Sequence, residues 1–306
     1  MERMAGVAEA GCGTKPVLVL SRSHRVQASL QLDFQRDGRT GRTVLASSHQ
    51  EPPLRVVRAF ALDDGAALVH LHNVSGGLLG GDRLGLKLNV GAEACAQITT
   101  AGATRIYRPR EESPVTTQSN EVVIGENALL EYLPDPLIPF AGARYSQRTV
   151  IQLSPGAGLF WWEVLAPGRE ARGEIFEYAS LEMKTDLVAI GRPIAIERVC
   201  LTPGKYSLSS RARLGSYRTW ATFYICRVGL EARTWLELER NLRETVEPFS
   251  APGRTLWGIS TLTAHGLVVR GVARRGRDVL AGLHALWRAA KPQLYGRDAV
   301  PPRKVN

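Results

Sequence analysis

The sequence predicts a mainly β protein: a twisted, β-helix-like body of stacked sheets with two α-helices in its C-terminal third. Apolar and polar residues alternate through much of the first two thirds of the 306 residues, which is the pattern of half-buried strands. Turns centred on glycine recur at positions 91, 125 and 156, so similar units follow one another along the chain. Two stretches near the end space their apolar residues three and four apart, which predicts helices.

The first strands can be placed by their alternation and by the turns between them. Residues 26–34 alternate between apolar and polar side chains, and Arg36–Arg42, with two glycines, predicts a turn before the next strand. Arg55–Leu62 and Ala66–His70 are predicted as consecutive strands joined at Asp63-Asp64-Gly65, because Asp-Gly is a strong hairpin signal.

The middle of the chain contains a weak internal repeat. Each copy has a strand, a tight turn centred on Gly91, Gly125 or Gly156, and then an apolar strand. The intervals of 34 and 31 residues are typical of stacked β units, as in a coiled sheet or β-helix. Consecutive hairpins of a β-sandwich would give the same pattern, so both architectures stay open at this point.

The first predicted helix begins near Thr234. This residue is a candidate N-cap with Glu237 three residues later, and Pro248 would end the helix. Its apolar stripe consists of Trp235, Leu238, Leu242 and Val246.

The second predicted helix runs from about Asp278 to a stop at Pro292. Trp287 continues its buried stripe, whereas Arg288 and Lys291 are predicted to lie off it. The stripe consists of Val279, Leu280, Leu283, Leu286, Trp287 and Ala290.

The charge of the chain indicates the kind of partner it could have. Lys and Arg number 39 against 29 Asp and Glu, a net +10 that favours nucleic acid, a membrane surface or an acidic protein. Most of the surplus is scattered arginine. The densest run, Arg274-Arg275-Gly276-Arg277, is short and typical of a solvated loop before a helix.

The four cysteines are far apart and form no Cys-x-x-Cys pair, which argues against a zinc site, a redox motif or a disulfide framework. Without a signal peptide or a run of about 18 apolar residues, the sequence predicts a cytoplasmic protein. Residues 1–25 are expected to form a flexible N-terminal segment, and residues 26–306 a single β domain that includes the C-terminal helices and tail.

Asn73–Arg83 is the most distinctive stretch of the chain. Two glycine pairs flank two leucines, and Asp82 follows the second pair. A phosphate-binding loop would need a helix after the turn, whereas an alternating strand follows here. The residues therefore predict a tight β-turn in which Asp82 is bonded to local amides.

No assembled catalytic site can be predicted from the residues. The chain has no Gly-x-Ser-x-Gly elbow, and its histidines lie in no nucleophile–base context. Glu163 follows the very apolar segment Leu159–Trp162, where burial of a carboxylate is costly without a partner. Either Glu163 belongs to an internal Arg–Glu pairing with the charged residues of 169–174, or it lines a polar path through the interior.

In order along the chain, several segments resemble the UreD (UreH) family of urease accessory proteins. They are Gly76–Asp82, Thr99–Arg108, Leu133–Pro136, Gly142–Thr149, Trp162–Val164, Gly168–Glu174 and Val300–Arg303. The matches run from about residue 26 to the end of the chain. One departure is Asn73-Val74-Ser75, where the family often has His-Pro-Pro, so that His72 sits one place off.

The resemblance implies a non-enzymatic scaffold for urease maturation, with a β-helix-like body and two helices. Such proteins bind apo-urease and the accessory proteins F and G, of which G is a GTPase that carries nickel. They are thought to pass Ni²⁺ to the empty active site through an internal polar path. Transient Ni²⁺ suits carboxylate oxygens that release it readily, so Asp82, Glu163 and Glu174 are the candidate residues. No tightly bound cofactor, nucleic acid or membrane is expected.

The resemblance also implies that accessory protein F docks near the C-terminal region. Two amphipathic helices and a basic tail can offer an interface there, so Arg288, Lys291 and Arg303 are the predicted contacts for an acidic partner. Two other classes stay open. A basic β-rich nucleic-acid-binding protein would bind in a salt-sensitive way, and a β-helix carbohydrate-active enzyme would need paired carboxylates on a groove.

Overall fold

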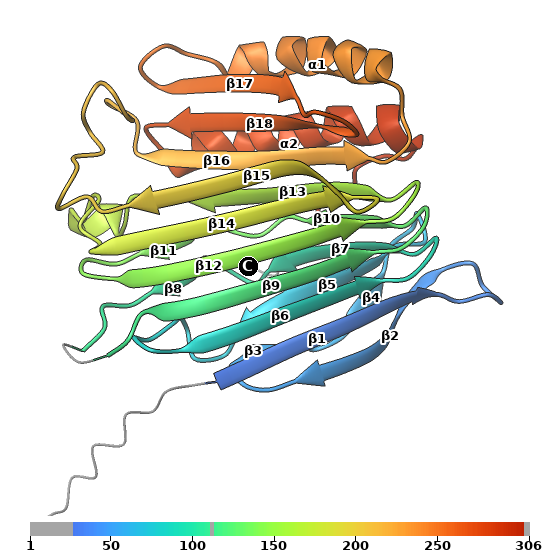
Figure 1. Cartoon of the computed structure of the whole chain (residues 1–306), viewed down its shortest axis with the longest axis horizontal. Coiled ribbons are helices and arrows are strands. Elements are labelled where there is room, and N and C mark those ends of the chain that lie inside the picture. The colour runs from blue at the N-terminus through green and yellow to red at the C-terminus, as the bar shows by residue number, and fades with distance from the viewer. Residues whose placement is uncertain (1–26, 111–112, 303–306) are drawn as a thin grey trace, which may run out of the picture.

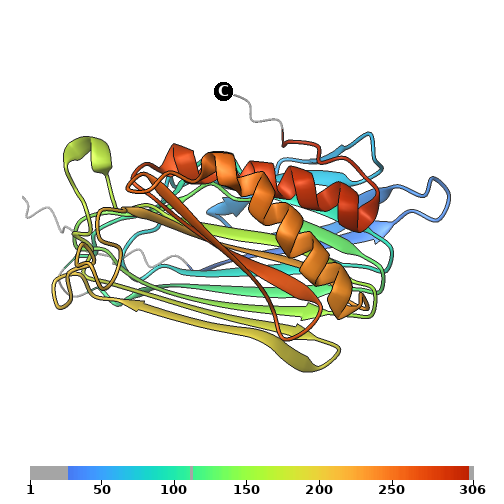
Figure 2. The ribbon, with the colours of Figure 1, turned by 90° about the horizontal axis from the view of Figure 1, so that it is seen from above.

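The computed structural model describes residues 27–110 and 113–302. The predicted N-terminal segment, residues 1–25, lies outside this part, as does Arg303. The fold has three layers: a first sheet, a second sheet packed against its inner face, and two helices on the outer side of the second sheet (Figure 2). Strand accounts for 46% and helix for 15%, which confirms the mainly β class with two helices in the C-terminal third.

The first sheet faces the viewer in Figure 1 and contains most of the long strands. Its strands β1, β6, β9, β12 and β14 pair in parallel, and the two edge strands pair antiparallel with their neighbours. In spatial order they are β15 (Arg192–Leu201), β14 (Ser180–Ala189), β12 (Arg144–Leu153), β9 (Thr116–Ile124), β6 (Arg83–Val90), β1 (Gln27–Arg36) and β2 (Thr43–Gln50).

In Figure 1 part of the second sheet lies behind the first, and its strands β16, β18 and β17 continue above it. Its main path, in spatial order, is β17 (Thr255–Thr261), β18 (Gly266–Ala273), β16 (Thr219–Arg227), β13 (Gly158–Leu165), β10 (Leu129–Tyr132), β7 (Cys95–Thr100), β5 (Ala67–Asn73) and β3 (Leu54–Arg55). Three short strands pair beside this path: β4 (Ala59–Ala61), β8 (Thr104–Ile106) and β11 (Leu137–Pro139).

The hairpin predicted at residues 63–65 is confirmed, since β4 and β5 pair antiparallel around it and Gly65 has a φ of +86°. The strand predicted over Arg55–Leu62 is wrong in its extent. It is divided into β3 and β4, and Val57 between them is exposed.

The glycine-centred turns carry the chain from the first sheet to the second, from β6 to β7, from β9 to β10 and from β12 to β13. Each strand then pairs in parallel with its counterpart in the next unit. The amide of Gly125 donates to the Val90 carbonyl at 2.8 Å. A Cβ on Gly125 would stand 2.9 Å from the nitrogen of Ala92, so glycine is needed where successive turns stack. The prediction of a β-helix-like repeat is therefore confirmed for these units. The alternative, consecutive hairpins of a β-sandwich, is excluded for them.

Two apolar cores hold the layers together, and β13 contributes to both. Because successive side chains of a strand point to opposite faces, Leu159 and Trp161 enter the core between the sheets. Phe160 and Trp162 instead enter the core between the second sheet and the helices.

Helix α1 (Ala232–Val246) buries the predicted stripe of Trp235, Leu238, Leu242 and Val246. It begins two residues before the predicted cap, so the prediction of Thr234 as the N-cap is wrong. Gly229, with a φ of +97°, ends the preceding strand region, and extended Glu231 leads directly into the helix. A short 3₁₀ turn, η2 (Glu247–Phe249), follows α1, and another, η1 (Glu170–Arg172), precedes β14.

Helix α2 (Gly276–Tyr295) starts two residues before Asp278 and continues through Pro292, so the predicted stop is wrong. The added turn is stabilised by burial and by contacts with β16. Leu294 is 3% exposed, and the Tyr295 hydroxyl donates to the Cys226 carbonyl at 2.9 Å. The helix ends at Gly296, which has a φ of +63°. Neither of the described α-helices is long and apolar enough to cross a membrane.

Candidate functional site: a polar belt between the sheets

Polar side chains replace the apolar core in part of the space between the two sheets. On β9 and β12, Gln118 stands beside Gln147 and Asn120 beside Thr149, and Thr185 of β14 continues the second row. We call this set, together with Glu163 of the facing sheet, the polar belt: Gln118, Asn120, Gln147, Thr149, Thr185 and Glu163.

Hydrogen bonds connect the polar belt from strand to strand. The Asn120 amide donates to the Thr149 hydroxyl at 3.0 Å, and the Gln147 amide donates to the same oxygen at 3.3 Å. The hydroxyl of Tyr145 lies 3.0 Å from the Gln118 carbonyl oxygen and 2.9 Å from that of Gln147. These partners compensate for burying polar groups between two sheets.

Glu163 is the charged member of the polar belt. It lies on β13 in the same alternation as Leu159 and Trp161, so it faces the first sheet, and the Gln147 amide donates to its carboxylate at 2.5 Å. Burial raises the pKa of Glu163 to about 7, and the nearby charge of Glu197 acts in the same direction. This carboxyl can therefore exchange a proton, or a proton for a cation, near neutral pH.

Three cavities follow the polar belt and share walls. The outermost, about 320 Å³, lies beside the glycine-rich turn. It shares Thr104, Gln118 and Tyr132 with a cavity of about 50 Å³. That cavity in turn shares Glu163 and Met183 with a third of about 10 Å³, room for about one water molecule. We call the third cavity the innermost because it is the last of the series that begins at the glycine-rich turn.

Glu197 of β15 lies on the wall of the innermost cavity with Glu163. The Tyr224 hydroxyl donates to its carboxylate at 2.5 Å, and Arg270 forms an ion pair with it. The innermost cavity thus brings a carboxylate that is paired with an arginine next to one that accepts from the Gln147 amide.

Asp82 closes the glycine-rich turn and is 1% exposed. Its carboxylate accepts from the Leu79 amide at 2.8 Å, and its own amide donates to the Leu79 carbonyl at 3.1 Å, which confirms the predicted tight turn. Gly81 has a φ of +89°. A Cβ on Gly77 or Gly80 would stand 2.4 Å from Tyr107 or Pro109, so these glycines serve close packing rather than a left-handed backbone.

Glu174 forms the internal Arg–Glu pair that the sequence suggested for Glu163. Its partner is Arg169, whose guanidinium also lies 4.3 Å from the centre of the Phe140 ring. Hydrogen bonding from Arg169 lowers the pKa of Glu174 below its ordinary value. A carboxylate held in this way is anionic and already paired at neutral pH.

The three predicted carboxylates do not converge. Within residues 27–110 and 113–302, no group of three or more His, Cys, Asp or Glu side chains is arranged to hold a metal ion. Of the three, Glu163 alone lines the cavities of the polar belt, while Asp82 and Glu174 stabilise turns. Contact of any of them with nickel stays a prediction.

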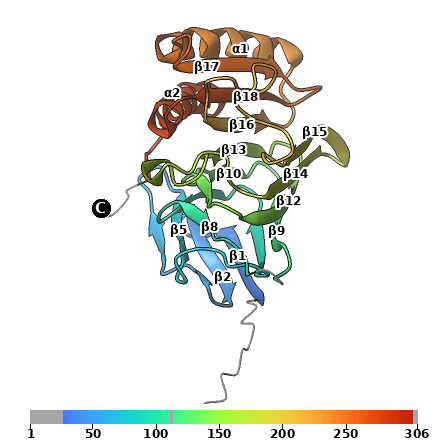
Figure 3. The same cartoon turned by 90° about the vertical axis from the view of Figure 1, so that its left-hand side faces the viewer.

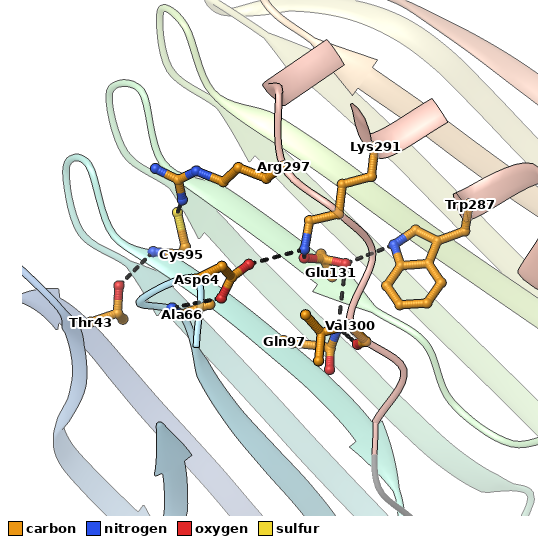
Figure 4. A network of polar contacts seen from close by, with 10 residues as sticks. All are labelled: Thr43, Asp64, Ala66, Cys95, Gln97, Glu131, Trp287, Lys291, Arg297 and Val300. Atoms are coloured by element: carbon orange, nitrogen blue, oxygen red, sulfur yellow. Dashed lines mark hydrogen bonds and ion pairs between the residues drawn. The ribbon is translucent and has the colours of Figure 1, made fainter. Parts of the chain in front are cut away.

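Lys291 corrects the predicted partner surface. Figure 4 shows it reaching from α2 toward the second sheet, where its ammonium group lies 2.7 Å from Glu131 and 3.3 Å from Asp64. It is 1% exposed, so it cannot contact a partner in this fold. The prediction that it lies off the buried face was wrong, because residues four apart share one face of a helix and Trp287 is on the buried one.

The buried pair of Lys291 and Glu131 has further partners. The Trp287 indole donates to Glu131 at 2.7 Å, which confirms that Trp287 belongs to the core. Gln97 donates to Glu131 at 3.4 Å and to the Val300 carbonyl at 3.0 Å, so the network also holds the chain after α2 (Figure 4). Burial raises the pKa of Glu131 even though Lys291 opposes the shift.

Arg288 is exposed, as predicted, on the side of α2 away from the sheet. It lines an open surface pocket of about 440 Å³ together with Phe249, His284, Pro301 and Pro302. Arg303 follows this pocket in sequence but lies outside the described residues.

The amide and hydroxyl members of the polar belt were missed in the sequence. Gln147 and Thr149 lie in the polar run Ser146–Thr149, which would equally suit a strand exposed to water. The internal repeat could have indicated the polar belt, because polar residues recur at corresponding inward positions of β9, β12 and β14.

Comparison with known proteins decides the family. The model of the UreD urease accessory protein family matches residues 26–306. The chain belongs to the UreD family. A urease accessory protein UreD of Herpetosiphon aurantiacus is 46% identical over 285 residues, covering 93% of this chain and 98% of that protein.

More distant members of the UreD family match over nearly the same length. A UreD of Pseudomonas fluorescens is 32% identical over 280 residues, covering 91% of this chain and 94% of that protein. A urease accessory protein UreD 2 of Brucella abortus is 30% identical over 277 residues, covering 88% of each. These relatives are named as accessory proteins of urease, not as enzymes.

Proposed function

We propose that this protein is a non-enzymatic scaffold for urease maturation in the cytoplasm. Membership of the UreD family over residues 26–306 is the observation that carries the proposal. In this role the protein binds the urease apoprotein and the accessory proteins F and G, the last a GTPase that carries nickel, and turns over no substrate itself.

Nickel ions pass along the polar belt in this proposal. Support comes from the chemistry of the belt, which offers amide, hydroxyl and carboxylate oxygens that bind such a cation weakly enough to release it. Glu163 must lose its proton to act as a ligand, and with a pKa of about 7 it can do so at physiological pH. Passage would also require the small inner cavities to widen, because the innermost holds only about 10 Å³.

A carbohydrate-active enzyme is a poorer fit to the same residues. Its two carboxylates would have to flank a sugar, at a separation of roughly 5–9 Å across an open groove. Glu163 and Glu197 instead share a cavity of about 10 Å³ between two sheets, which has no room for a sugar ring.

Deleting the gene is expected to leave urease largely as inactive apoprotein. Restoring the wild-type chain should return urease activity and nickel content together, measured on the purified urease. The purified chain alone should hydrolyse no urea. Full nickel loading of urease in the deletion strain at ordinary nickel concentrations would contradict the proposed function.

We also propose that accessory protein F docks on the pocket around Arg288, where Phe249 and two prolines form an apolar border beside a cation. Arg288→Glu is expected to weaken co-purification of F several-fold, because it reverses the charge offered to an acidic partner. Arg240→Glu, which reverses another exposed arginine, on α1, is the matched control. Equal retention of F by both variants, with unchanged melting temperatures, would place its binding site elsewhere.

A further inference from the structure

Cationic residues gather at one end of the strands, in three segments that are distant in sequence. Residues 202–218, 250–254 and 274–278 contain eight Lys and Arg against a single carboxylate, that of Asp278. We call these segments the basic end. Its cations are Lys205, Arg211, Arg213, Arg218, Arg254, Arg274, Arg275 and Arg277.

Backbone contacts hold the three segments of the basic end together. The Arg218 amide donates to the Ala273 carbonyl, and the Arg274 amide to the Arg254 carbonyl, both at 2.9 Å. The Gly253 amide donates to the Tyr217 hydroxyl at 3.1 Å. Figure 3 views the molecule from this side, with the long loop before β16 in front.

Most cations of the basic end have no counter-charge within the protein. Arg218 pairs with Glu170 at 2.8 Å, and Asp278 pairs with Arg254 at 3.0 Å and with Arg277 at 3.9 Å. The remaining unpaired cations are exposed, and within the part of the chain that the structure describes no carboxylate lies in ion-pair distance of Lys205, Arg211, Arg213, Arg274 or Arg275. Like charges that lie close together repel one another, and this repulsion lowers the stability of the fold unless an opposite charge is bound.

The long loop is held in place rather than loosely solvated. Leu208 is 4% exposed and packs in a smaller apolar cluster with Leu165 of β13 and Leu181 of β14, against which Trp220 of β16 also packs. The Leu214 amide donates to the Leu208 carbonyl at 3.0 Å, and the Arg213 guanidinium donates to the Ser207 carbonyl at 3.1 Å. Preorganised cations lose little conformational entropy when a partner binds.

We infer that the basic end is a docking surface for an acidic protein. The inference rests on the proposed function, from which the candidate partners are taken. Arginine, which supplies seven of the eight cations, pairs with carboxylates through two parallel hydrogen bonds. Nucleic acid is a poorer fit, because the exposed Tyr206 ring is already covered by Arg213 at 5.1 Å and by Lys205 at 5.8 Å.

The position of the basic end adds a reason for a protein to cover it. Trp220, two residues after Arg218, is a wall of the innermost cavity, which also contains Glu163. A partner seated on the basic end would therefore lie beside one end of the polar belt.

The test reverses three exposed charges of the basic end, in the variant Arg211→Glu, Arg213→Glu and Arg275→Glu. Binding is measured to purified urease apoprotein, F and G from the same organism. At least one of the three should bind about tenfold or more weakly at roughly 0.15 M salt, with a shallower dependence of its affinity on salt. A matched control reverses Arg39 and Arg42, between β1 and β2, and Arg192, the first residue of β15. All three are exposed at the opposite strand ends, and their reversal should leave binding unchanged.

The inference is overturned if all three proteins bind the reversed and control variants alike, or if a DNA duplex binds the wild-type chain more tightly than any of them. Should the reversed variant melt early, glutamine at the same three positions gives the same comparison with less repulsion. Urease activation by the wild-type chain, tested in the deletion strain, decides the proposed function separately. If the wild-type chain restores urease activity in the deletion strain but the reversed variant binds its partners normally, only the docking surface is rejected.

Discussion

Replacing Lys291 with methionine is expected to destabilise the protein by about 3–5 kcal/mol at neutral pH, the usual cost of removing one partner of a buried ion pair. The substitution keeps the length and apolar stem of the side chain but leaves Glu131, 2% exposed, without a cation. The carboxyl must then stay charged in the interior without a partner or take up a proton, and both outcomes lower the free energy of unfolding. Urea unfolding of the purified variant at fixed pH measures the loss.

A double variant separates the charge from the packing. Lys291→Met combined with Glu131→Gln removes both charges and keeps an acceptor for the Trp287 indole, so it should regain a large part of the lost stability. Arg288→Met changes an exposed neighbour of the same helix and should stay within about 0.5 kcal/mol of the wild type. A loss below about 1 kcal/mol for Lys291→Met would mean that the pair does not form in solution.

The strands and their stacking could be predicted because the signals are local. Alternation in residues 26–34 reflects one face of β1 on the core, and the glycines at 91, 125 and 156 mark turns that stack on one another. Helix stripes followed from the same reasoning. Helix ends did not, because Pro292 is accommodated only through the burial of Leu294 and the bond from Tyr295 to β16, contacts invisible in sequence.

The interior charges could not be predicted because their partners are far away in sequence. Glu131 lies in a four-residue strand of otherwise apolar and aromatic residues, and its cation comes from a helix 160 residues later. Glu163 was recognised as costly to bury, but its donor, Gln147, belongs to the facing sheet and looks like a solvent-facing strand residue. These residues become neighbours because the β-helix-like fold places successive units in register.

Replacing Glu163 with glutamine is expected to stabilise the protein, and more so at pH 8 than at pH 5. Burial raises the pKa of Glu163 from 4.5 to about 7, so the folded chain holds this proton over a range where the unfolded chain has lost it. Stability therefore falls as pH rises from about 4.5 to about 7 and stays lower above that range. Glutamine cannot ionise, so the variant should gain about 1–3 kcal/mol in free energy of unfolding at pH 8, and this gain should vanish near pH 4. Urea unfolding at several pH values measures it.

Glu174→Gln is the matched control and should show the opposite sign. Its carboxylate has a lowered pKa through Arg169, so it stabilises the fold above its unfolded pKa and loses that effect in acid. Glutamine at position 174 should therefore cost stability at pH 8. Equal unfolding free energies for Glu163→Gln and wild type at every pH would contradict a raised pKa at Glu163.

The same Glu163→Gln variant is expected to activate urease several-fold more slowly at limiting nickel, although it is the more stable protein. An amide in place of the carboxylate removes the negative charge that attracts a cation to the inner cavities, while it keeps an acceptor for the Gln147 amide. Slower activation by a more stable scaffold cannot come from unfolding, so it would point to the path itself. Nickel content of urease at a fixed time, compared among wild type, Glu163→Gln and Glu174→Gln, measures the effect. Normal activation by Glu163→Gln would remove this residue from the nickel path and leave the polar belt with a structural role.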